Sequence, residues 1–358
     1  MRILKLALFI LGCALMSESL LLGIEVDGER DEGYGDPVAV QRIQTGFGDP
    51  GSELDAAYAI VLEEKLYLMI TGNLEPNFNK LEIFIDSKLG GQNKIIAKEN
   101  PNNDNWSAKF DGFTFDSGFT ADYLLIVRHG LGGTQLDLDF AELGEGGKGS
   151  LIGRFDPVSL GRPGPFEASN GVVIGFDNTN SAGIGSTQGQ LANQESASLV
   201  NTGLELSIPM NLIGSPRGEI KICAMINGHG HDYLSNQFLG SMPEWTRNPG
   251  TNGQGEFVQD SSLKDVDLND YEGDQFFVVS GPVTPLQIIN LSYDAESENV
   301  SITWASHPES FYTIESSIDM KVWQEMDDGI ESQGEETTHD HLILDNKDKS
   351  RFYRIVKE

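Results

Sequence analysis

Cysteine is nearly absent from this sequence of 358 residues, which contains two. Cys13 lies in an apolar N-terminal stretch, so Cys223 is expected to be the only cysteine of the processed chain. A lone thiol forms no internal disulfide, and the hydrophobic core must therefore stabilise the fold. Cys223 follows an alternating apolar pattern and is predicted to be a small buried core residue.

Basic residues are also scarce. The chain has 24 Lys and Arg against 55 Asp and Glu, which gives a net charge of −31. Such a charge repels nucleic acid and anionic membrane surfaces, so both are poor candidates for partners and no nucleic-acid partner is expected. Two explanations for the charge stay open: solubility in a salty medium, and the binding of divalent cations such as calcium.

Long hydrophobic runs are missing after the first residues. Arg2 and Lys5 precede the apolar run Leu6–Leu11 and a group of small residues, an order typical of a secretory signal peptide over residues 1–23. The run is shorter than the roughly 20 residues of a spanning helix, so no transmembrane segment is predicted. The segment ending at Cys13 also resembles a lipoprotein box, which leaves a lipid anchor at Cys13 as an alternative. We expect a protein that is secreted, extracellular or attached to the cell surface.

Strand patterns dominate the remaining sequence and predict an all-β fold. Alternating or β-branched runs are separated by connectors rich in Gly, Asn and Asp. A short helix is expected at Met210–Ile213 and coil at Tyr233–Leu239. The predicted strands of the larger part are Ala57–Leu62, Lys65–Thr71, Lys80–Ile85, Asp122–His129, Gly171–Phe176, Gly203–Ile208, Glu219–Ile226 and Gln275–Val279.

Two prolines and a glycine within Ser280–Pro285 predict a stiff linker at residues 281–285. The sequence therefore divides into a large domain, residues 24–280, and a small domain, residues 286–358. The small domain has strand patterns of its own, and alternation turns Trp304 and Tyr312 toward its interior, as in a fibronectin-like sandwich. Trp323 is predicted to be a core residue as well.

The start of the large domain resembles the modules grouped as family 9 carbohydrate-binding-module-like, which are related to DOMON domains. The resemblance rests on Val26-Asp-Gly-Glu-Arg-Asp31, Lys65-Leu-Tyr-Leu-Met-Ile-Thr71 and Leu81-Glu-Ile-Phe-Ile-Asp86. It implies a jelly-roll-like β-sandwich that binds sugar chain ends, haem or an unknown ligand. The sequence departs from the group at Gly130–Asn201, an insertion for which hairpins are expected, and it offers no identifiable pair of aromatic residues to enclose a sugar.

The small domain resembles the short C-terminal sandwich found at the end of many secreted bacterial hydrolases and surface proteins. Val300-Ser-Ile-Thr-Trp304, Asp319-Met-Lys-Val-Trp323 and Arg351-Phe-Tyr-Arg-Ile355 carry this resemblance. It implies a fibronectin-III-like fold and an accessory or surface-associated module rather than a catalytic one.

Trp106 and Trp245 are the candidate ligand-binding residues, because both lie in polar segments. An indole in such a loop can stack on a sugar face while neighbouring amides and carboxylates bind its hydroxyl groups. The alternative is that each indole anchors its loop to the core.

Two segments are candidate metal sites. Asp265, Asp267, Asn269 and Asp270 place oxygen ligands at alternate positions, as calcium loops do, although the segment does not fit an EF-hand. His229, His231 and Asp232 could offer ligands to zinc. For both segments, a polar or acidic surface loop is the alternative.

Local catalytic motifs are missing: the sequence contains no Gly-x-Ser-x-Gly, His-Glu-x-x-His or P-loop pattern. We therefore expect a secreted or cell-surface, non-catalytic binding protein, with a polysaccharide or cell-surface glycan as its ligand. One alternative is an extracellular glycoside hydrolase, because a pair of carboxylates leaves no spacing in the sequence. Another is a structural or adhesive surface protein.

Overall fold

The computed structural model describes residues 23–47, 51–180, 189–258, 262–281, 286–294, 297–306, 310–334, 336–342 and 351–357. These residues form two compact units that divide at Gly281. Both units are built from antiparallel sheets, which confirms the predicted all-β sandwich class. Cys13, residues 1–22 of the expected signal peptide and residues 282–285 of the linker lie outside the described residues.

In the large unit, one sheet has six strands in the order β1-β2-β3-β10-β9-β8. Their bounds are β1 Ala39–Val40, β2 Glu53–Leu62, β3 Lys65–Asn73, β8 Phe166–Glu167, β9 Val173–Phe176 and β10 Gly203–Pro209. The other sheet has seven strands in the order β12-β11-β4-β5-β6-β7, and β13 pairs with β11 beside β12. Their bounds are β4 Lys80–Asp86, β5 Tyr123–Gly130, β6 Gln135–Glu142, β7 Gly149–Phe155, β11 Ile220–Asn227, β12 Leu234–Leu239 and β13 Phe277–Val279.

Helices are few and short in the described part of the large unit. They are the α-helices α1 Trp106–Phe110, α2 Pro157–Leu160 and α3 Gln194–Leu199, with the 3-10 turns η1 Glu32–Tyr34, η2 Ala97–Glu99, η3 Asn103–Asn105, η4 Leu131–Gly133, η5 Met210–Ile213 and η6 Leu268–Asp270. The expected helix at Met210–Ile213 is therefore a single 3-10 turn. Among the described residues, no helix has the length and apolar character needed to cross a membrane.

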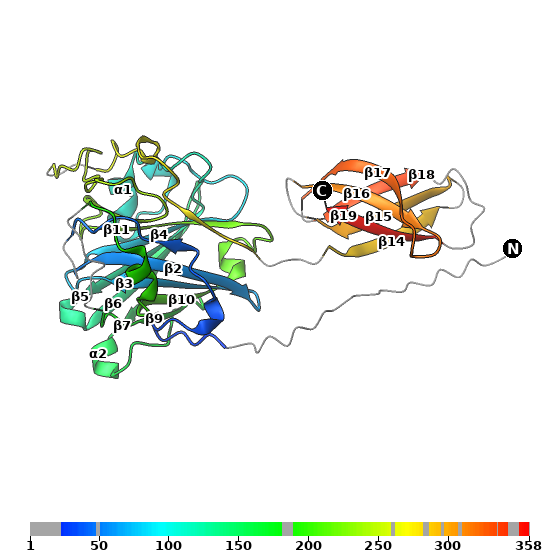
Figure 1. The fold of residues 1–358 in the computed structure, drawn as a ribbon. Helices are drawn as coiled ribbons and strands as arrows, with labels where there is room; N and C mark the ends of the chain where they lie inside the picture. Colours follow the sequence, from blue (N-terminus) through cyan, green and yellow to red (C-terminus); the bar gives the residue numbers. More distant parts are fainter. Residues whose placement is uncertain are drawn as a thin grey trace. The chain divides into compact units, whose positions relative to one another are not determined.

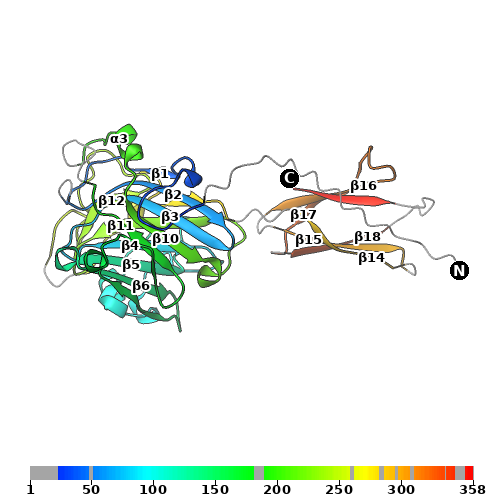
Figure 2. The ribbon, with the colours of Figure 1, turned by 90° about the horizontal axis from the view of Figure 1, so that it is seen from below.

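The two sheets pack face to face, as Figures 1 and 2 show, and strand alternation explains how. Leu81, Ile83 and Ile85 of β4 are buried in the core between the sheets. Because successive side chains of a strand point to opposite faces, Glu82 and Phe84 lie on the outer face of the seven-stranded sheet. That outer face is also covered: Phe84 packs in a second core, which draws its other aromatic residues from residues 106–119 and from Phe238, Tyr271 and Phe276.

One sequence-based expectation for this unit is wrong and another is confirmed. Tyr233–Leu239 was expected to be coil, but Leu234–Leu239 forms the fully buried strand β12. The buried polar residues Asn236 and Gln237 hide its pattern, since the Asn236 amide donates hydrogen bonds to the carbonyl oxygens of Gln44 and Thr246. The hairpins expected within Gly130–Asn201 are present: β6 pairs with β7 and β8 pairs with β9, both antiparallel, and β6 and β7 extend the seven-stranded sheet beyond β5.

The small unit is a sandwich of two three-stranded sheets, β14-β15-β18 and β17-β16-β19. Trp304 and Tyr312 are fully buried, as predicted, with ring centroids 5.6 Å apart in an edge-to-face arrangement. Trp323 differs from its prediction, because it is only half-buried and lies 4.5 Å from the guanidinium carbon of Arg354. The strands are β14 Ile288–Asp294, β15 Asn299–Ala305, β16 Phe311–Ser317, β17 Gln324–Glu331, β18 Glu336–Leu342 and β19 Phe352–Lys357.

Candidate functional site

Five neighbouring strands of the seven-stranded sheet bring a row of polar side chains together on its outer face. In the strand register, Lys80 of β4 pairs with both Asn227 of β11 and Arg128 of β5. Arg128 pairs with Asp137 of β6, which pairs with Arg154 of β7. Residues two positions along a strand share a face, so Glu82 and Asp139 continue this polar area toward the middle of the sheet. We call these residues the charged row: Asn227, Lys80, Arg128, Asp137, Arg154, Glu82 and Asp139.

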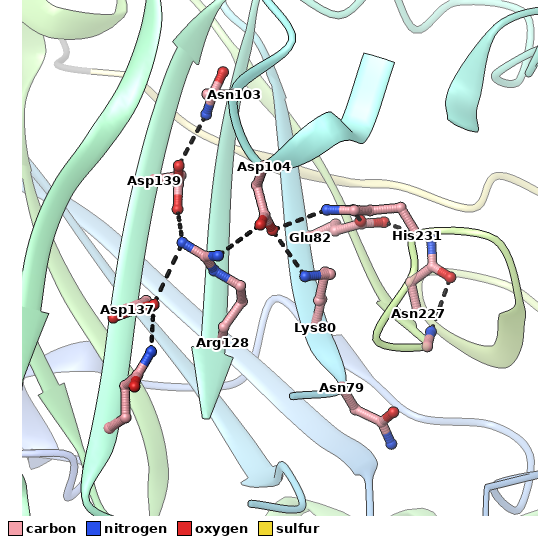
Figure 3. A network of polar contacts seen from close by, with 12 residues as sticks. Asn79, Lys80, Glu82, Asn103, Asp104, Arg128, Asp137, Asp139, Asn227 and His231 are labelled. Carbon is pink, nitrogen blue, oxygen red and sulfur yellow. Dashed lines mark hydrogen bonds and ion pairs between the residues drawn. The ribbon is translucent and has the colours of Figure 1, made fainter. Parts of the chain in front are cut away.

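Two loop residues complete the network shown in Figure 3. The Asp104 carboxylate lies 2.7 Å from Lys80 Nζ, 2.6 Å from Arg128 Nη1 and 2.9 Å from His231 Nε2. The other ring nitrogen of His231, Nδ1, contacts the Glu82 carboxylate. His231 and Glu82 are buried, so the two carboxylates hold this imidazole from both sides away from solvent.

The second half of the network is centred on Arg128. Its guanidinium also contacts the Asp139 carboxylate and lies 3.5 Å from Asp137 Oδ2. Asp137 in turn accepts two hydrogen bonds from Arg154, 2.7 Å from Nε and 2.9 Å from Nη2, in a bidentate arrangement. Asn103 donates to Asp139 over 3.1 Å. Each of the buried carboxylates Asp137 and Asp139 therefore has an arginine partner.

The network lowers the pKa of Asp104 and raises the pKa of His231. Burial alone would raise the pKa of Asp104, but hydrogen bonds from His231 and Lys80 and the charge of Arg128 hold it well below its usual range. Burial alone would lower the pKa of His231, but the hydrogen bonds to Asp104 and Glu82 outweigh it and raise that pKa. Both shifts favour a protonated imidazolium that donates one hydrogen bond to each of the two carboxylates.

An open cleft of about 520 Å³ lies over the charged row. Lys80, Arg128, Asp137 and Arg154 line it on the side of the sheet. On the loop side, Lys109 forms an ion pair with Asp232 over 3.0 Å. The cleft also contains two aromatic rings, those of Phe78 and His229, whose centroids are 5.5 Å apart with a 33° angle between their planes.

Backbone strain is concentrated around this cleft. Four of its non-glycine lining residues have positive φ angles: 70° at Phe78, 55° at Asp104, 63° at Asn105 and 56° at His231. An L-residue adopts this region at a cost, and such residues cluster at functional sites because the surrounding structure must hold them there. The ring of Phe78 has room because its neighbour is Gly130, where an added Cβ would lie 2.2 Å from the ring.

The two candidate tryptophans have opposite environments. Trp106 is fully buried at the start of α1 and packs against Phe84 and Phe110, so the prediction that it contacts a ligand is wrong. Burial of the indole leaves no face for a sugar. Trp245 is 61% exposed and borders a separate pocket of about 240 Å³ together with Arg247 and Tyr271. Its role as a ligand contact stays a prediction.

The candidate metal sites have a different organisation from the expected one. Among the described residues, no group of three or more His, Cys, Asp and Glu is arranged to hold a metal ion. The zinc prediction is wrong because His231 uses both ring nitrogens in contacts with carboxylates. The calcium segment, Asp265, Asp267, Asn269 and Asp270, forms a turn: the Asp267 carboxylate accepts from Asn269, and the Asn269 amide binds the Phe115 carbonyl oxygen over 2.9 Å.

Sequence reasoning overlooked the charged row, although part of its signal was available. Lys80, Glu82 and Phe84 alternate with apolar residues inside a correctly predicted strand, which places two charges on the same face as an aromatic core residue. Asp137 and Asp139 show the same alternation in β6. In comparisons with protein families, with characterised proteins and with solved structures, the chain matches none.

Proposed function

We propose that the large unit is a non-catalytic carbohydrate-binding domain whose ligand occupies the cleft over the charged row. The observation that carries this proposal is the combination of a rigid hydrogen-bonding floor with the ring pair of Phe78 and His229. A sugar presents hydroxyl groups around its ring and an apolar ring face. Fixed carboxylate, ammonium and guanidinium groups suit the first, and an aromatic ring suits the second.

Preorganisation supports binding at this place. Lys80, Arg128 and Asp137 are on paired strands, and each is held by ion pairs before any ligand arrives. Side chains already fixed in one geometry lose little conformational entropy on binding, which improves affinity for a polar ligand.

The charge state of the cleft favours binding over hydrolysis. A glycosidase needs a carboxylic acid whose raised pKa lets it protonate the leaving oxygen. Asp104, at the centre of this cleft, has its pKa shifted in the other direction. The described carboxyl groups with clearly raised pKa values, such as Glu205 and Asp116, do not line the cleft.

Location outside the cell is part of the same proposal. It rests on the signal-like first 23 residues and on the resemblance of the small unit to accessory modules of secreted proteins. In this arrangement the small unit tethers or spaces the binding domain. The ligand is then a polysaccharide or a cell-surface glycan.

The test is binding of the full processed chain to a panel of soluble and insoluble polysaccharides, with released reducing sugar measured in the same samples. His229→Ala removes an exposed ring from the cleft and is expected to weaken binding about tenfold. Trp245→Ala removes an exposed ring from the other pocket and serves as the matched variant.

Retention without sugar release that depends on His229 supports the proposal. Retention that depends on Trp245 alone would move the ligand to the other pocket and overturn the assignment of the cleft. Release of reducing sugar would establish the hydrolase alternative.

A further inference from the structure

The charges of the cleft are layered on the side formed by β5, β6 and β7. The side chains of Asp137 and Asp139 are 1% and 2% exposed. Those of Arg128 and Arg154, which cover them, are 14% and 58% exposed. A ligand approaching this side therefore meets the Arg154 guanidinium first, while the carboxylates of Asp137 and Asp139 are buried.

Asp137 fixes the geometry of these two arginines. It accepts a bidentate pair of hydrogen bonds from Arg154 and lies within 3.5 Å of Arg128, so both guanidinium groups are oriented by the same buried carboxylate. A guanidinium has five N–H donors, and Arg154 uses only Nε and Nη2 on Asp137. The Arg154 side chain is 58% exposed and lines the cleft, so a ligand there can reach its remaining donors.

This local arrangement contrasts with the rest of the molecule. The chain has 24 basic residues and a net charge of −31, yet this one cleft is lined by four basic residues, Lys80, Lys109, Arg128 and Arg154, against the three carboxylates of Asp104, Asp137 and Asp232. The surrounding negative charge repels a densely charged polyanion. It disfavours a single carboxylate on a largely neutral chain far less, because screening limits repulsion beyond about 8–10 Å.

We propose that the cleft selects a saccharide that carries a uronic acid unit, with the sugar carboxylate bound by Arg154. This inference rests on the proposed carbohydrate-binding function and names its ligand class. Guanidinium groups bind carboxylates through paired, charge-assisted hydrogen bonds, which exceed neutral ones in strength. Phe78 and His229 then contact the ring face, and Asp104 and Asn105 are within the same cleft to accept hydroxyl hydrogens.

The experiment compares acidic polysaccharides with chemically matched neutral forms. Three polymers of low charge density are used: glucuronoxylan, glucuronate-tipped arabinogalactan and highly methyl-esterified pectin. Each is tested beside a form in which its carboxyl groups have been reduced to alcohols. For at least one pair, the acidic form is expected to bind the full chain about tenfold more tightly, which is the effect of one good charge-assisted contact.

Arg154→Gln is the diagnostic variant, because this side chain is largely exposed and its loss leaves the fold intact. It is expected to reduce binding of the acidic polymer to the level of its reduced form. Arg217→Gln is the matched control: Arg217 is 38% exposed, forms an ion pair with Glu64 and lies next to the opposite end of β11. The Arg217→Gln variant is expected to bind the acidic polymer as tightly as the unsubstituted protein does.

The outcomes separate this inference from the function on which it rests. Equal binding of the acidic and reduced forms, lost in His229→Ala, would overturn the uronate assignment and leave the proposed function standing. Preference for the acidic form that survives Arg154→Gln would also overturn it. Failure to bind any of the six polymers or any member of the wider panel would overturn both.

Discussion

The outer face of the seven-stranded sheet is divided into an apolar half and a charged half, although the same strands supply both. On β4, Phe84 belongs to the apolar half and Glu82, two residues earlier, to the charged half. Loops rich in aromatic residues cover the first half, where Phe84 lies 4.9–6.0 Å from the ring centroids of Trp106, Phe110 and Phe115. The charged half is lined by side chains that form ion pairs, and it remains open as a cleft.

The difference shows how one sheet can serve stability and recognition at once. Burial of aromatic surface in the apolar half fixes the strands, because a close-packed core resists displacement. The side chains of the charged half therefore project from strands that the apolar half already holds in place. Lys80 and Arg128 consequently keep their positions, although buried ion pairs by themselves contribute little net stability.

The largest effect is expected in the apolar half. Phe84→Ala removes a fully buried ring from the second core and is expected to lower the free energy of unfolding by about 4 kcal/mol. Urea denaturation of the large unit measures it. Leu89→Ala, which truncates an 85% exposed side chain, is the control and is expected to change stability by less than about 0.5 kcal/mol. Similar losses in both variants would contradict the picture of a sealed apolar half.

In the charged half, Glu82→Gln is expected to lower the free energy of unfolding by about 3 kcal/mol. The substitution leaves the buried His231 cation with one carboxylate partner fewer. His231→Asn removes that cation and keeps a residue tolerant of positive φ. The double variant should therefore lose less than the sum of the single losses. Additive losses would show that the two side chains do not interact.

The same pair predicts a pH dependence with a defined sign. The pKa of His231 in the folded protein is raised above its ordinary value of 6.5. Its stabilising contribution is therefore complete below pH 6.5 and is lost as the pH rises through the raised value. The loss caused by Glu82→Gln should shrink over that range. NMR titration of the His231 imidazole measures the pKa directly, and an unshifted or lowered value would contradict the network.

The strands of the charged half could largely be predicted from the sequence. The contacts that bring Asp104 and His231 onto these strands could not. Alternation in Lys80–Ile85 predicts which side chains share a face. The arrival of Asp104 and His231 depends on loops with positive φ angles; these residue types tolerate such angles but do not indicate where the loop leads. Strand register and loop course are long-range properties, so the network became visible only in three dimensions.

The two tryptophans illustrate the same limit. Trp106 and Trp245 both lie among polar residues in the sequence, and this pattern suggested exposed loops for both. Trp106 is buried because Phe84 of β4 and Phe110, at the other end of α1, pack against its indole. The contact with Phe84, on a strand distant in the sequence, cannot be read from the residues around Trp106.

Glu205 is a buried carboxyl group whose hydrogen-bond donors are neutral, in contrast to the carboxylates of the charged half. Glu205 of β10 accepts hydrogen bonds from the backbone N–H groups of Asp27 and Gly28 and from the Tyr34 hydroxyl. This contact anchors the acidic turn near the N-terminus. Burial outweighs the three hydrogen bonds and raises the pKa of Glu205 to about 7, whereas cations surround Asp104 and lower its pKa.

A group with a raised acid pKa destabilises the fold once it ionises. Glu205 is therefore expected to cost about 3 kcal/mol of stability as the pH rises from about 4.5 through 7. Glu205→Gln removes the charge, and its amide can donate to Tyr34 while its oxygen accepts from the backbone. The difference between the two unfolding free energies, measured across this pH range, should change by that amount. Parallel curves would show that Glu205 ionises normally.

The smallest stability effect is expected where the charged half reaches solvent. Arg154→Gln removes a 58% exposed partner of Asp137, and Asp137 keeps Arg128 within 3.5 Å. Exposed ion pairs contribute little, so the loss should stay below about 1 kcal/mol. Asp137→Asn, which alters the buried member of the pair, should cost more, because it removes the buried negative charge and replaces one acceptor oxygen with an NH2 donor facing guanidinium groups. Equal losses by urea denaturation would mean that Arg154 supports the fold, and its outward donors would then lose their significance for binding.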